Sequence, residues 1–266
     1  MSAPVSLPLL SVAARKRIRR LHKKKYRLED RSVLLEGARL VADALDSVVP
    51  LKEAVVLRGM EEKHGELVER LTKAGVTVMV AEEQEFSRLS NTIHSQGIIA
   101  TTVELPDPEI TDPGNLLLGL DAVSDPGNLG TLLRTAEWFG VRRVLLSKGC
   151  VDPFNPKVVR ASMGSILRLQ LRDLDEASLV PDDFVAVGAT ASGGSSVYDP
   201  LPERMLLLMG SEAAGFSDRL ETKIELKVTI PGYGGAESLN VAVAAAIIMA
   251  EHRRQHGSEI KAKLDE

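Results

Sequence analysis

The sequence of 266 residues contains one cysteine, Cys150, so it can form neither an internal disulfide nor a thiolate metal cluster. Aromatic residues make up only 3%, which predicts an aliphatic core and leaves little scope for widespread stacking on nucleobases. No apolar run approaches the roughly 20 residues that span a membrane, and there is no Gly-x-Gly-x-x-Gly turn for a dinucleotide. His252 and His256 are the only closely spaced histidine pair, which we interpret as a solvated helix end rather than a zinc site. These absences argue against a disulfide scaffold, a membrane protein and a metalloprotein.

Charge is unevenly distributed along the chain. The net charge is −4, which alone argues against a nucleic-acid binder. Residues 15–31, however, hold ten basic and two acidic residues, a local charge of +8 that leaves −12 for the remainder. This basic block can neutralise phosphates even in an acidic protein, although a solvated helix explains the block alone equally well. Because it follows the mildly apolar residues 1–10, the reverse of a secretory signal, we expect a cytoplasmic protein.

A linker is predicted near the middle of the chain. Residues 104–113 (ELPDPEITDP) contain three prolines and four acids, a composition that suits neither a central strand nor a helix interior. We therefore divide the chain into an N-terminal domain (residues 1–104), a linker (105–113), a C-terminal domain (114–256) and a polar tail (257–266).

Short apolar runs alternate with helical patterns in the N-terminal domain. A basic helix is predicted to extend to about Arg27. Strands are predicted at residues 33–35, 54–57, 76–80 and 98–102, and helices after Gly37, at 61–74 and at 82–89. This alternation predicts a small α/β domain.

The C-terminal domain has the same alternation, with strands that are almost continuously apolar. They are predicted at residues 116–120, 144–146, 185–187, 205–209 and 228–230. Such runs are typical of a parallel sheet covered on both faces. Ligands bind these sheets in the loops after the carboxyl ends of the strands, and polar residues and glycines gather there in this chain.

The first candidate motif lies in residues 121–140 (DAVSDPGNLGTLLRTAEWFG). Asn128 is interpreted as the N-cap of a helix that begins after a Pro-Gly turn. Arg134 is predicted to project from the polar side of that helix, one turn from Trp138. Taken alone, the segment is explained as well by a capping asparagine and a solvated arginine.

The second motif, residues 205–217 (MLLLMGSEAAGFS), follows a buried strand. Its glycines allow the backbone to approach a ligand closely. Glu212 is a carboxylate at the mouth of an apolar sheet, where it needs a cationic partner. An ordinary tight turn is the structural alternative.

The third motif, residues 228–250 (VTIPGYGGAESLNVAVAAAIIMA), joins a strand to an alanine-rich helix that is apolar on all sides. Ser238 and Asn240 stand at the start of that helix, where free backbone N–H groups face a ligand. By itself this motif is also consistent with a phosphate-binding loop.

Together the three segments resemble the SpoU/TrmH branch of the SPOUT RNA methyltransferases. They follow the family order: N-x-G-x-x-x-R at residues 128–134, G-S-E-x-x-G at 210–215, then I-P-G at 230–232 and S-L-N-V at 238–241. Residues 155–164 (NPKVVRASMG) resemble the connecting segment of the family. The N-terminal domain resembles its ribosomal-protein-like substrate-binding domain, on the basic start, Leu35-Glu36-Gly37 with Arg39, and Gln96-Gly97-Ile98. Ser95 departs from the pattern, because many relatives carry histidine there.

The resemblance implies a fold, a cofactor and a set of site residues. The C-terminal sheet would contain a deep trefoil knot, a feature otherwise essentially absent from proteins. The knotted domain would form a homodimer, bind S-adenosylmethionine without a metal, and methylate a ribose 2′-hydroxyl of RNA. The residues implied in cofactor binding are Thr190, Gly210, Ile230, Pro231, Ser238 and Leu239. Those implied in catalysis are Asn128, Arg134, Glu212, Ser238 and Asn240, and the RNA contacts are expected at Arg15, Arg19, Lys23, Lys24 and Arg39.

Several alternatives stay open on the sequence alone. An rRNA substrate is favoured over tRNA because the basic helix and its domain resemble those of rRNA enzymes. A base N-methyltransferase is disfavoured, since the Asn128 and Arg134 motif marks the ribose branch. From another class, the chain could be a non-catalytic RNA-binding protein with the same fold. A small-molecule methyltransferase would leave the basic block without a role.

Overall fold

A computed structural model describes the chain except for residues 1–6, 48, 93–94, 175–180, 212–213 and 258–266. The chain forms two compact units, one of Met1–Pro106 with Phe154–Leu167 and one of Asp107–Pro153 with Arg168–Glu266. The division near residue 106 lies within the predicted linker. Residues 154–167, which the sequence assigned to the C-terminal domain, have their contacts in the first unit. Among the described residues, no helix is long and apolar enough to cross a membrane.

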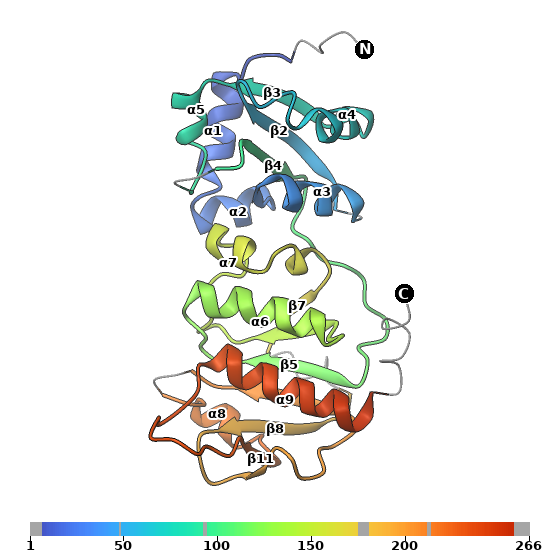
Figure 1. Ribbon diagram of the computed structural model, residues 1–266, viewed down its shortest axis with the longest axis vertical. Helices are drawn as coiled ribbons and strands as arrows, with labels where there is room; N and C mark the ends of the chain where they lie inside the picture. The colour runs from blue at the N-terminus through green and yellow to red at the C-terminus, as the bar shows by residue number, and fades with distance from the viewer. Residues whose placement is uncertain (1–6, 48, 93–94, 175–180, 212–213, 258–266) are drawn as a thin grey trace. The chain divides into compact units, whose positions relative to one another are not determined.

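The first unit contains a mixed four-stranded sheet with the order β1-β4-β2-β3. Its strands are β1 (Leu34–Glu36), β2 (Leu51–Leu57), β3 (Thr77–Ala81) and β4 (Ile98–Thr102). Strand β4 runs antiparallel to β1 and β2, whereas β2 and β3 are parallel. Its helices are α1 (Val12–Arg20), α2 (Lys24–Asp30), α3 (Ala38–Asp46), α4 (Gly65–Lys73), α5 (Glu83–Ser87) and α7 (Pro156–Ala161), shown in Figure 1. The predicted α/β domain is therefore confirmed.

The basic helix is broken, contrary to the prediction that it runs on to about Arg27. Helix α1 ends at a cap on Leu21, and α2 begins only after Lys23. The Arg27 side chain donates a hydrogen bond to the Leu21 carbonyl at 2.7 Å and is only 3% exposed. The break allows Leu21 to join Ile18 in the core, which is aliphatic apart from Phe86.

The second unit contains a seven-stranded sheet in which every pair of neighbours is parallel, as the apolar runs predicted. Its order is β7-β6-β5-β10-β8-β11-β9. The strands are β5 (Leu116–Leu120), β6 (Arg143–Leu146), β7 (Gln170–Asp173), β8 (Val185–Thr190), β9 (Ser195–Ser196), β10 (Met205–Met209) and β11 (Leu226–Thr229). Helices α6 (Pro126–Trp138) and α9 (Val241–His256) lie side by side, and α8 (Asp218–Glu221) precedes β11, as Figure 1 shows. The trefoil knot implied by the resemblance stays a prediction.

The end of α9 is buried, so the interpretation of His252 and His256 as a solvated helix end is wrong. His252 is fully buried, and its Nε2 donates to the Glu203 carbonyl at 3.0 Å. Burial lowers the pKa of His252 to about 4. His256 contacts the Leu201 carbonyl at 2.8 Å, so the segment before β10 covers this helix end. The described residues contain no group of acids, histidines or cysteine that could hold a metal ion.

Candidate functional site

A cavity of about 820 Å³ lies in the second unit, in the loops that follow β8, β10 and β11. This is the carboxyl-end edge of the parallel sheet, where ligands of such sheets bind. All six residues that the resemblance implied in cofactor binding line it: Thr190, Gly210, Ile230, Pro231, Ser238 and Leu239. Residues from three strand ends therefore meet at one cavity.

The turn after β10 brings two backbone segments unusually close. Ser211 and Gly215 exchange backbone hydrogen bonds of 2.9 and 3.0 Å. A Cβ atom on Gly210 would lie 2.6 Å from the Gly215 carbonyl, closer than real Cβ atoms come to backbone. Gly215 itself has a φ of +69°, a conformation that favours glycine. The glycines of this motif are thus required by the turn, which forms part of the cavity wall.

Asp121, which directly follows β5, also holds this turn in place. Its carboxylate is 5% exposed and accepts a hydrogen bond from the Ser217 backbone at 2.8 Å. Burial alone would raise its pKa, but hydrogen bonds from Ser217 and Ser147 outweigh that effect, so the pKa of Asp121 lies below its ordinary value. Sequence reasoning missed Asp121, although a single acid directly after an apolar strand is a detectable signal.

The cavity fits S-adenosylmethionine in size and in the character of its walls. Small-molecule sites typically measure roughly 300–1,000 Å³, are mostly apolar and carry a few placed polar groups. Buried apolar side chains from Met209, Val228 and Ile248 are part of the lining. Hydroxyl groups and glycine backbone also line the cavity, a combination suited to an adenine ring beside a polar amino-acid moiety.

Asn128 and Asn240 are joined, although 112 residues separate them in sequence. The Asn240 side-chain amide donates to Asn128 Oδ1 at 3.0 Å, while Asn240 Oδ1 caps α9 by accepting from Ala242 N at 2.9 Å. The interpretation of Asn128 as an N-cap is wrong. Asp125 caps α6, accepting from Asn128 N at 2.8 Å with Pro126 in the first turn. The Asn128 side chain is therefore available to contact α9.

Arg134 lies on the exposed side of α6, one turn before Trp138. Within the described part of the chain it forms neither a hydrogen bond nor an ion pair. Its predicted partner, Glu212, lies outside the described residues. No described residue therefore occupies the donors of this guanidinium.

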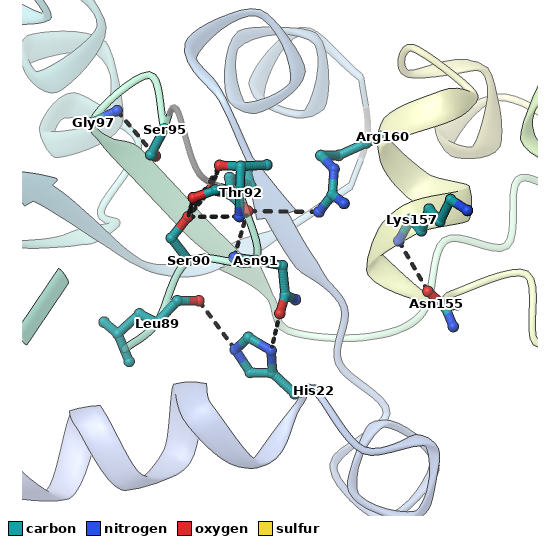
Figure 2. A network of polar contacts seen from close by, with 11 residues as sticks. His22, Leu89, Ser90, Asn91, Thr92, Ser95, Gly97, Asn155, Lys157 and Arg160 are labelled. Atoms are coloured by element: carbon teal, nitrogen blue, oxygen red, sulfur yellow. Dashed lines mark hydrogen bonds and ion pairs between the residues drawn. The ribbon is translucent and has the colours of Figure 1, made fainter. Parts of the chain in front are cut away.

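The five expected RNA contacts differ in their surroundings. Arg15 is ion-paired with Glu85. The other four, Arg19, Lys23, Lys24 and Arg39, are exposed and form no ion pair with any described residue. In the same unit, residues 90–92 and Arg160 of α7 take part in a network of polar contacts (Figure 2). The residue that these contacts share is the carboxylate of Glu36.

Comparison with known proteins agrees with this geometry. Residues 115–250 match the model of the SpoU rRNA methylase family, and residues 15–100 match the MRM3-like substrate binding domain. The chain is 36% identical to the 23S rRNA (guanosine(2553)-2′-O)-methyltransferase RlmP of Bacillus subtilis, over 87% of this chain and 92% of that protein.

Solved structures show the same likeness. An rRNA methyltransferase from Sinorhizobium meliloti, bound to S-adenosylmethionine, superposes with a TM-score of 0.80 at 29% identity, covering 93% of this chain and 97% of that one. An RNA 2′-O ribose methyltransferase superposes with a TM-score of 0.75 at 27% identity, covering 94% and 98%.

Proposed function

Because the chain belongs to the SpoU family of RNA methyltransferases, we propose that it methylates the ribose 2′-hydroxyl of a guanosine in large-subunit rRNA. The observation that carries this proposal is the cavity at the carboxyl ends of the parallel strands, lined by every residue expected to bind S-adenosylmethionine. The rRNA substrate and the guanosine are supported by RlmP, which is similar over almost the whole of both chains.

The chain's own residues account for binding of the cofactor. Ile230 and Leu239 would cover the adenine, and the backbone around Gly210 would hydrogen-bond to it. Ser238 would contact the polar end of the cofactor. When bound, S-adenosylmethionine supplies an electrophilic methyl group for the ribose oxygen.

Arg134 would act on the acceptor as a cation. A guanidinium stays protonated in proteins, so it is a poor candidate for a general base. It can clamp the neighbouring phosphate and stabilise the negative charge that develops on the 2′-oxygen during methyl transfer. Asn128, held by Asn240, would orient the nucleotide, while Glu212 would position Arg134. Positioning of this kind supplies much of the rate in group-transfer reactions.

Two further properties belong to the proposal. We expect a homodimer formed through the second unit, because Trp138 on α6 is 84% exposed and Val243 on the adjacent α9 is 48% exposed. Large exposed apolar side chains mark interaction surfaces. Sedimentation should give a dimer at micromolar concentration, and a stable monomer would refute this expectation.

We place the reaction in the cytoplasm, in keeping with the single free cysteine and the RNA substrate.

Two alternatives make different predictions. A tRNA enzyme of the same family would methylate tRNA and leave rRNA unchanged. A non-catalytic RNA-binding protein would fail to bind S-adenosylmethionine in calorimetry, although its RNA affinity would persist.

Ribose-methylation mapping of total RNA tests the proposal. RNA from cells with the gene, without it, and with Arg134→Ala is compared. We expect one rRNA site to disappear on deletion and to stay unmethylated with Arg134→Ala, while Arg142→Ala, a variant of an exposed arginine paired with Asp112, restores it. An rRNA map unaffected by deletion would reject the proposal, and full methylation by Arg134→Ala would reject the role of that residue.

A further inference from the structure

The carboxylate of Glu36 organises a buried polar centre in the first unit. Its side chain is 5% exposed. It accepts hydrogen bonds from the Ser90 hydroxyl, from Thr92 Oγ1 at 2.6 Å and from the Asn91 backbone at 3.1 Å. Three consecutive residues of one loop are thus fixed by a single carboxylate. Burial of a charge is costly unless it is satisfied in this way, so the 90–92 loop has a defined conformation.

Arg160 faces this centre from α7 but does not use its hydrogen-bonding capacity there (Figure 2). Its Nη1 lies 3.7 Å from Glu36 Oε2, an ion pair beyond hydrogen-bond distance, and its side chain is 30% exposed. That Nη1 is buried and forms no hydrogen bond within the part of the chain that the structure describes. Nη1 is thus held against Glu36, whereas the remaining donors of the fork, on a side chain that is 30% exposed, form no hydrogen bond with a described residue and can bind a ligand from solvent.

Another buried carboxylate of the same unit shows what a purely structural pair looks like. Glu53 is 2% exposed, and Arg17 binds it through both arms of the guanidinium, at 2.9 Å from Nε and 2.5 Å from Nη2. That pair is made of two direct hydrogen bonds from Arg17. The pair of Arg160 and Glu36 holds the guanidinium in place but leaves its donors unused.

The 90–92 loop also reaches the basic block. Asn91 Oδ1 lies 2.7 Å from His22 Nδ1, and His22 Nε2 donates to the Leu89 carbonyl at 3.0 Å (Figure 2). His22 stands between α1 and α2, directly before the exposed Lys23 and Lys24. A chain of contacts therefore runs from the basic block through the loop to α7, on which Lys157 is also exposed.

We propose that Arg160 binds a backbone phosphate of the substrate RNA, on a surface formed by α7, the 90–92 loop and the start of α2. Glu36 is the positioning residue of this surface: it holds the loop and orients Arg160 without contacting RNA. Asn91 and Lys157 are the neighbouring contacts. An arginine fork matches phosphate in geometry, and Glu36, the carboxylate nearest to Arg160 among the printed ion pairs, is itself buried and satisfied. This inference rests on the proposed function for the identity of the RNA.

Binding of the full-length chain to deproteinised rRNA, purified from cells that lack the gene, tests the proposal. Arg160→Ala should weaken binding about tenfold and reduce the slope of log affinity against log salt by about 0.7, the value for one phosphate on single-stranded RNA. In methyl transfer from tritiated S-adenosylmethionine, KM for RNA should rise while kcat and cofactor affinity stay unchanged. Arg70→Ala, which removes an exposed arginine paired with Asp46 in the same unit, is the matched control and should change none of these quantities.

Glu36→Gln separates positioning from contact. It should weaken RNA binding, and the double variant with Arg160→Ala should bind no more weakly than Arg160→Ala alone, because both act through one contact. Glu53→Gln also removes a buried carboxylate and should lower thermal stability without weakening RNA binding. Equal loss of RNA affinity in the Glu36 and Glu53 variants would show a structural effect only and would overturn the assignment of Glu36.

If Arg160→Ala does not fold, Arg160→Lys keeps the charge but loses the fork. It should then preserve the salt slope while lowering affinity. Unchanged affinity and slope in a folded Arg160 variant would overturn the proposal. Failure of the proposed function is recognised separately, as an absence of methyl transfer by the wild-type chain, and leaves the binding measurement intact.

Discussion

Asn240 uses the two ends of its side-chain amide for different purposes. The oxygen caps α9, and the nitrogen donates to Asn128 on α6. One residue therefore begins the last helix and ties it to a candidate catalytic residue. This double contact explains why asparagine occupies its position in the S-L-N-V motif. An alanine or a serine could not make both contacts.

The two contacts can be separated by substitution. Asn240→Asp keeps the capping oxygen but loses the donor to Asn128, so we expect thermal stability near that of the wild type and a kcat lowered at least tenfold. Asn240→Ala loses both contacts and should also cost about 1 kcal/mol of stability, the usual value of an N-cap. Thermal unfolding and single-turnover methylation measure the two effects. Full activity of Asn240→Asp would contradict the role of the contact to Asn128.

His252 makes stability depend on pH. Its folded pKa of about 4 lies below the ordinary value of 6.5, so the folded state holds the imidazole neutral. Its contribution to stability is complete above pH 6.5 and is lost as pH falls toward 4, because the unfolded chain then binds the additional proton. Between pH 7 and 5 we expect the free energy of unfolding to fall by about 2 kcal/mol on this account. His252→Gln should flatten this part of the plot of unfolding free energy against pH. An unchanged slope would contradict the assignment of the pH dependence to His252.

Residue roles can be predicted from the sequence only where the residues belong to motifs that occur in a recognisable order. Asn128 and Arg134 belong to the first of three ordered motifs and Asn240 to the third, so their presence in one unit could be expected. The role of Glu36 depends on residues 90–92 and on Arg160, and nothing in the sequence spacing predicts these contacts. The interpretation of Asn128 as an N-cap fails because it puts the Pro-Gly turn outside the helix, whereas Pro126 is the first helical residue.

At the scale of elements, apolar strands were predicted well and polar ones were missed. Strands β4, β5 and β10 begin and end where their apolar runs do. Strand β7 (Gln170–Asp173) lies at an edge of the sheet and carries a charged, half-exposed sequence. Strand β9 has only two residues. Hydrophobic patterning reports burial on both faces, so it cannot detect edge strands that lack such burial.

The turn after β10 offers a test of the cavity wall. Gly210→Ala would force the backbone at Gly215 to move, and we expect the affinity for S-adenosylmethionine to fall at least tenfold in calorimetry. Gly234→Ala is the matched control: Gly234 also lines the cavity, but no atom lies within 4 Å of the place that its added methyl group would take, so affinity should change little. Equal affinities for the two variants would contradict the assignment of this cavity to the cofactor.

At the scale of the molecule, the basic block supplies fewer free charges than its composition suggests. Arg17 and Arg20 are committed to ion pairs, as are Arg15 and Lys25, and Arg27 is buried. Only a subset of the block can therefore offer its charge to the proposed RNA substrate. A sequence count of basic residues overestimates how many phosphates are neutralised, because intramolecular carboxylates compete for the same cations.

The division into units does not follow the family boundary. Residues 154–167 lie within the stretch that matches the SpoU family, but their contacts are in the first unit. Val158 and Val159 are fully buried, α7 contacts β1, and Arg160 pairs with Glu36. The first unit is therefore built from two separate pieces of chain, and a cut at the linker would remove one of them.

Fragments test this organisation. A fragment of residues 1–106 would lack α7, leaving apolar surface uncovered and Glu36 without its cation, so it should unfold at a lower temperature than the same fragment joined to residues 154–167 by a Gly/Ser linker. In a domain of this size each kcal/mol of stability changes the Tm by roughly 4–8 °C, so a contribution of about 1 kcal/mol is measurable by calorimetry. Arg160→Ala in the joined fragment should remove part of the gain, whereas Lys157→Ala, at an exposed position, should not. Identical Tm values with and without residues 154–167 would contradict this expectation. They would show that the segment contacts the first unit without stabilising it.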